Sequence, residues 1–167
     1  MPWHRVLPFL LFATACGTWS VPSRAAVRAG TYEYAISHDV LGRIGTHTAT
    51  FAQQGADLIV TLKIQLAVKI GGLTLYTFES SGNEVWRDGN LIAASADTND
   101  NGRLKHVTAH SSGDRLVIEG PRGRVEAVRP VGTVNFWNFD SLAVPILIEP
   151  TSGRVYRVEI NPAQRES

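Results

Sequence analysis

The most constraining feature of this sequence is a regular alternation of apolar and polar residues over Leu58–Ile70. Every second side chain in this stretch is apolar, whereas Thr61, Lys63 and Gln65 occupy positions between them. Successive side chains of a β-strand point to opposite faces, so a strand here would be apolar on one face. A helix would scatter the same apolar residues around its axis. The alternation therefore predicts a strand with one face turned toward a core.

Several other stretches predict strands in the same way. They are Tyr32–Ile36, Leu73–Trp86, Leu91–Ala96, Leu104–Ala109, Arg115–Glu119, Arg124–Val128 and Arg154–Ile160. Gly71-Gly72, Asp88-Gly89 and Asn101-Gly102 separate neighbouring stretches and suit tight hairpin turns. We expect an all-β antiparallel meander of about eight to ten strands that curls into a closed or half-open barrel. Residues 135–150 break the pattern and predict a loop or short helical turn at one end.

Residues 1–25 have the layout of a secretory signal peptide. A positive charge precedes an apolar run of about ten residues that ends in small side chains. The run is shorter than the roughly 20 apolar residues that a membrane-spanning helix needs. Cleavage after Ala15 or Ala25 fits the small residues there, and residues 26–167 then form a single domain. We therefore expect export to the periplasm.

Cys16 is the only cysteine of the chain. It follows Ala15 directly, so lipidation of Cys16 is an alternative to simple cleavage, and it would anchor the protein to a membrane. In either case the exported domain has no disulfide and no thiolate chemistry. The formal net charge of +1 gives no reason to expect a nucleic acid partner.

Glu84 is the most notable polar residue. Strand parity places it on the same face as Tyr76, Phe78 and Trp86, which is the apolar face. A carboxylate among aromatic rings has a raised pKa and can act as a general acid or base or bind a polar ligand group. Two alternatives remain open: a bulge near Gly82 would turn Glu84 to solvent, and a neighbouring arginine could pair with it.

The remaining candidates for chemistry are weak. His106 and His110 share a strand face but lie about 13 Å apart at the usual rise per residue, too far to chelate one ion. No serine has the setting of a hydrolase nucleophile. The Asp and Asn residues before Gly102 resemble a calcium loop, but a hairpin turn explains them. The sequence predicts no catalytic residue, no metal site and no cofactor.

The motifs between residues 76 and 102 resemble those of an uncharacterised family of exported bacterial proteins, known only as a domain of unknown function. The shared pattern is Tyr-x-Tyr/Phe, Glu-x-Trp-x-Asp-Gly-x-Leu and Thr-x-x-Asn-Gly, followed by a strand. A Trp137-Asn138 pair is also similar. The resemblance implies export and a β fold but brings no catalytic residue. At the level of fold, the layout is similar to lipocalin-like sheets and to the curled sheets of periplasmic lipoprotein carriers.

These features favour a non-enzymatic binding or carrier protein for an apolar, lipid-like ligand. The expected ligand-binding residues are Tyr76, Phe78, Glu84, Trp86 and Trp137. The aromatic residues around Trp137 could instead cap the core. Two alternatives are an envelope interaction or structural module with a filled core, and an enzyme that uses Glu84 as general acid or base.

Overall fold

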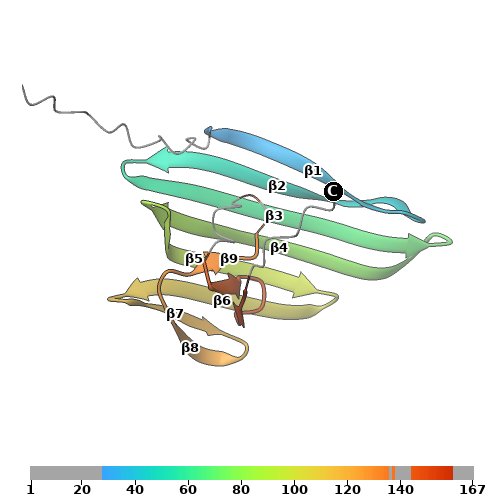
Figure 1. Cartoon of the computed structure of the whole chain (residues 1–167). Coiled ribbons are helices and arrows are strands. Elements are labelled where there is room, and N and C mark those ends of the chain that lie inside the picture. The colour runs from blue at the N-terminus through green and yellow to red at the C-terminus, as the bar shows by residue number, and fades with distance from the viewer. Residues whose placement is uncertain (1–27, 136, 138–143, 160–167) are drawn as a thin grey trace, which may run out of the picture.

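The computed structural model describes residues 28–135, 137 and 144–159 of the chain (Figure 1). The described residues form strands and turns, without a helix long and apolar enough to cross a membrane. The strands are β1 Gly30–His38, β2 Gly42–Gln54, β3 Asp57–Ile70, β4 Leu73–Arg87, β5 Asn90–Asp100, β6 Arg103–Ser112, β7 Arg115–Gly120, β8 Gly123–Val128, β9 Gly132–Thr133, β10 Ile146–Glu149 and β11 Arg154–Arg157. The expected all-β class is confirmed. The signal segment and Cys16 lie outside the described residues.

Strands β1 to β8 form one antiparallel sheet in which each strand pairs with the next along the chain. This arrangement confirms the predicted meander. Of the two expected forms, closed or half-open, the closed barrel is not formed by the described strands, because β1 and β8 are the two edges of the sheet and do not pair with each other. Closure would require these edges to meet, and the alternation of side chains does not determine whether they do.

The hairpin turns form where the sequence predicted them. Asp88 and Asn101 have φ values of 51° and 50°, and the glycines that follow them also have positive φ. Two successive residues with positive φ match the twist of the flanking strands. The Asp and Asn cluster before Gly102 is therefore accounted for by a turn, in which the Gly102 N–H donates to Asn99 Oδ1.

A second, smaller sheet corrects the prediction of a loop or helical turn over residues 135–150, because Ile146–Glu149 form strand β10. Residues 136 and 138–143 lie outside the described residues. Strand β10 pairs in parallel with β9 and antiparallel with β11. Leu147 and Ile148 of β10 are both buried, so this short strand has no polar face and no alternation. It lies between Pro145 and Pro150, which limit its length.

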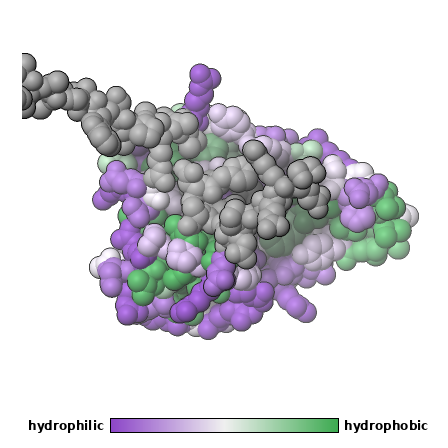
Figure 2. Space-filling model, viewed as in Figure 1, coloured by the Kyte–Doolittle hydropathy of each residue, from purple (hydrophilic) through white to green (hydrophobic). Residues whose placement is uncertain are grey.

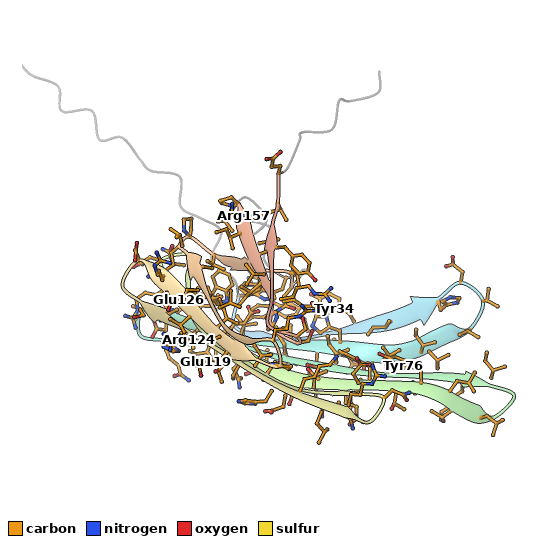
Figure 3. All side chains as sticks on the ribbon, turned by 90° about the horizontal axis from the view of Figure 1, so that it is seen from below. Tyr34, Tyr76, Glu119, Arg124, Glu126 and Arg157 are labelled. Atoms are coloured by element: carbon orange, nitrogen blue, oxygen red, sulfur yellow. The ribbon has the colours of Figure 1, made fainter. Side chains whose placement is uncertain are left out.

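The small sheet covers only part of one face of the main sheet, which we call the inner face. Ile148 of β10 joins a buried cluster with Phe51, Val60, Leu91 and Leu116 from the main sheet. Figure 3 shows β10 and β11 standing over one end of the main sheet, while the β1–β2 and β3–β4 hairpins extend away from them. The core therefore occupies one half of the inner face.

Candidate functional site

Glu84 lies on the inner face, within the covered half. Its neighbours across the sheet are Val60 on β3 and Ala94 on β5, and all three side chains are buried. Gly82 stays in register with Ala96, and the irregularity in β4 falls later, between Val85 and Trp86. A bulge near Gly82 therefore does not turn Glu84 to solvent, and the predicted orientation is confirmed.

The Glu84 carboxylate is held by neutral hydrogen-bond donors. The indole Nε1 of Trp86 donates to Oε2 over 2.9 Å, and that of Trp137 donates to the same oxygen over 3.0 Å. The side-chain amide of Asn135 donates to Oε1. A hydrogen bond from Thr133 adds to them. In the described part of the chain, the partners of this carboxylate are neutral side chains from β4 and from the residues after β8, and none of them is an arginine.

Aromatic rings enclose this network. Trp137 contacts both Trp86 and Phe51 edge to face, with ring centroids 5.5 and 5.3 Å apart. Such pairs contribute about 0.5–1.5 kcal/mol each beyond the area they bury. Because Trp137 and Asn135 follow β9, their bonds to Glu84 on β4 attach the small sheet to the main sheet.

Burial raises the pKa of Glu84 above its ordinary value, while the hydrogen bonds from Trp86, Asn135, Thr133 and Trp137 act in the opposite direction. The charge loses hydration that no cation replaces. The fold thus opposes ionisation of Glu84 by desolvation.

A pH titration of stability tests this account. With its pKa raised, folded Glu84 binds more protons than the unfolded chain just above the unfolded pKa, so stability falls as pH rises through the folded pKa. Glu84→Gln removes that dependence. Denaturant unfolding between pH 4 and pH 8 should therefore show the variant gaining stability relative to the wild type as pH rises. An unchanged or opposite difference would contradict the raised pKa.

The space beside Glu84 is small. A gap of about 20 Å³ lies between Glu84, Asn135 and the residues after β10. That volume accommodates about one water molecule. Glu84 is 1% exposed, so the described arrangement of this carboxylate fits a structural role.

In the other half of the inner face, the large side chains are less buried than those of the core. We call it the open half and define it by six large side chains that are only partly buried: Ile36, Ile64, Leu66, Val68, Tyr76 and Phe78. These residues lie outside the buried cluster to which Val60 and Leu62 of the same strand belong. The structure thus separates the five predicted site residues, with Tyr76 and Phe78 in the open half and Glu84, Trp86 and Trp137 in the covered half.

Polar groups border the open half. The Tyr76 hydroxyl donates to Asp100 over 2.7 Å, and Lys105 Nζ donates to the other Asp100 oxygen over 2.7 Å. Lys105 and Tyr76 lower the pKa of Asp100. His47 lies beside Ile64, its pKa is lowered by burial, and its Nε2 is buried without a hydrogen-bond partner among the described groups.

The outer face of the main sheet is polar and carries a groove of about 530 Å³ that includes Ser81, Asp97 and His106. His106 Nδ1 lies 2.7 Å from Asp97 Oδ1, and both side chains are largely exposed. Ser81 and His106 are two strand spacings apart, about 10 Å. A nucleophile must bond its base directly, so these residues do not form a hydrolase triad. The described residues also contain no group of three or more metal-binding side chains.

Comparison with known families agrees with the motif resemblance. A family model described as a domain of unknown function, DUF6134, matches residues 25–167. The chain belongs to this family. Neither a curated protein nor a solved structure matches the chain.

In this DUF6134 chain, the motif residues form hydrogen bonds and turns of the main sheet. Glu84 and Trp86 bond each other, Asp88-Gly89 and Asn101-Gly102 form turns, and Thr98 bonds Ser80 within the sheet over 2.9 Å. Sequence reasoning missed Asn135, because its distance of 51 residues from Glu84 gives no local pattern. It also missed His47, whose inner-face position is clear only once β2 is paired with β3.

Proposed function

We propose that this DUF6134 protein is a non-enzymatic carrier that binds an apolar, lipid-like ligand on the open half of the inner face. The supporting observation is the change in burial along β3. Val60 is 0% exposed beneath the small sheet, whereas Ile70 at the far end of the strand is 55% exposed. Removing apolar surface from water contributes about 25 cal/mol per Å². An apolar ligand placed here continues the core that β9–β11 complete on the other half.

The border of the open half supports a ligand with one polar group. Tyr76, Asp100 and Lys105 form a polar rim, and His47 offers a buried nitrogen that can accept or donate a hydrogen bond. An acyl chain against Leu66 and Phe78 with its head group near His47 or Lys105 would use both kinds of surface.

Export is part of the same proposal. We place the carrier in the periplasm after removal of residues 1–25, either released or anchored to a membrane through a lipid on Cys16. A carrier in this compartment has contact with lipids of the cell envelope.

The alternatives are less well supported. An enzyme that uses Glu84 requires a substrate beside a carboxylate that already accepts hydrogen bonds from Trp86, Trp137 and Asn135. An envelope interaction module with a filled core fits the covered half but does not explain the partly exposed apolar side chains of the open half.

Ligand uptake by the purified, delipidated protein tests the proposal. A fluorescent fatty acid should bind saturably, with about one probe per chain and an emission shift to shorter wavelength. Mass spectrometry of protein purified without delipidation should detect bound lipid. Absence of both probe binding and co-purified lipid would refute the carrier function, and capture of an envelope protein by the same surface would favour the interaction module.

A further inference from the structure

The two edges of the main sheet differ in length and charge. Strand β8 has six residues and carries Arg124 and Glu126, which pair with each other over 3.2 Å. Arg124 also pairs with Glu119 over 3.5 Å, and Figure 3 shows all three side chains at this edge. Charged side chains on an edge strand discourage a further strand from adding to it. The β8 edge is therefore protected.

Strand β1 is nine residues long and has fewer such protections. Glu33 is its only acidic residue, and the strand contains neither proline, lysine nor arginine. Within the described ranges, no strand pairs with its outer side. A long edge with free backbone N–H and C=O groups is a template for a further strand.

We propose that β1 pairs antiparallel with β1 of a second copy of this chain, about a two-fold axis that passes through Tyr34. In this register Tyr34 lies opposite Tyr34 of the second copy, and Tyr32 lies opposite Ile36. These side chains share the inner face, where aromatic and apolar cross-strand pairs stabilise a sheet. The interface is self-complementary, as a two-fold contact requires.

Charge disfavours one of the neighbouring registers. An axis one residue earlier would place Glu33 opposite its own copy, and like charges directly opposite destabilise a strand pair. With the axis at Tyr34, Glu33 lies opposite Ala35. The irregularity of β1 falls after Ile36, so the stretch from Tyr32 to Ile36 stays regular.

The exposed aromatic side chains of β1 favour a partner over solvent. Tyr32 is 41% and Tyr34 52% exposed, yet Tyr32 packs edge to face on Phe51 and Tyr34 lies against His47. These contacts hold the rings in place before a partner arrives, which reduces the entropy lost on association. The inner faces of both copies then lie on the same side of one continuous sheet. The inference does not depend on the proposed ligand.

A charge swap at the axis tests the dimer. We expect the wild type to sediment as a monomer–dimer equilibrium. Tyr34→Lys and Tyr34→Glu each place like charges opposite one another and should raise the dimer dissociation constant about tenfold or more. An equimolar mixture of the two variants should recover the dimer, because opposite charges then meet. Val128→Lys is the matched control on β8, where Val128 is 51% exposed, and should leave the dissociation constant unchanged.

The inference is overturned if the wild type stays monomeric up to millimolar concentration, or if the charge-swapped mixture associates no better than its components. Hydrogen exchange of the wild type gives a measurement that needs no variant. Amides of β1 should gain protection as protein concentration rises, whereas those of β8 should not. The same dependence of amide protection on protein concentration at β1 and at β8 would also overturn the inference.

Discussion

Glu84→Met is expected to destabilise the fold by about 3 kcal/mol or more. The substitution keeps the length of the side chain and removes the acceptor of the Trp86, Trp137 and Asn135 donors. Each buried donor left without a partner costs about 1–3 kcal/mol. The loss of the charge offsets part of this cost, since an ionised group is no longer buried. Denaturant unfolding should show a lower midpoint with an unchanged slope.

Glu84→Gln is the matched control for this substitution. The glutamine oxygen can accept from both indoles, and its amide group can donate to Asn135 once the Asn135 amide turns over. We therefore expect a change of at most about 1 kcal/mol, because the hydrogen bonds are kept while a desolvated charge is removed. Equal loss of stability in the Met and Gln variants would contradict the view that the network acts through acceptors rather than through charge.

The second large effect is expected from Leu66→Glu in the open half of the inner face. Leu66 is partly exposed, so a carboxylate there stays hydrated and the fold is retained. A bound acyl chain would have to desolvate that charge. We expect the dissociation constant for a fluorescent fatty acid to rise at least about thirtyfold, which corresponds to about 2 kcal/mol. The measurement is probe titration of delipidated protein.

Ala67→Glu provides the control for the ligand face. Ala67 is the next residue of β3, lies opposite Thr77, and points to the outer face. The same charge on this face should leave probe affinity within about twofold of the wild type. Equal losses in both variants would show that negative charge on β3, rather than the inner face, decides binding.

Alternation predicted most of the main sheet because a sheet with one buried face requires it. Strand β2 was not predicted, since its inner-face residues include Gly45, His47 and Ala49, which do not stand out from the threonines between them. Strand β10 was missed for the opposite reason, because Leu147 and Ile148 are both buried. Neither strand displays the contrast between faces on which the prediction rests.

Strand parity placed Glu84 on the correct face, but its partners could not be predicted. Asn135 and Trp137 lie 51 and 53 residues further along the chain and reach Glu84 only through the packing of the small sheet. The alternation likewise did not predict that the main sheet has two unpaired edge strands. Twist and the length of edge strands decide whether a meander closes, and period-two patterning contains neither.

Figure 2 shows hydrophobic residues at the end of the molecule where the β1–β2 and β3–β4 hairpins turn. Exposed apolar residues there are Val40, Leu41, Ile70, Leu73 and Leu75. They extend the apolar character of the open half to the tip of the sheet. Contiguous exposed apolar surface is typical of a binding region.

We propose that an apolar ligand occupies the open half of the inner face. Photo-crosslinking with a diazirine-labelled fatty acid, followed by peptide mass spectrometry, locates the bound chain directly. We predict labels on inner-face residues of β3 and β4, between Ile64 and Phe78, and a reduced yield in the Leu66→Glu variant. Labels confined to the outer face, or equal labelling of folded and unfolded protein, would contradict the claim.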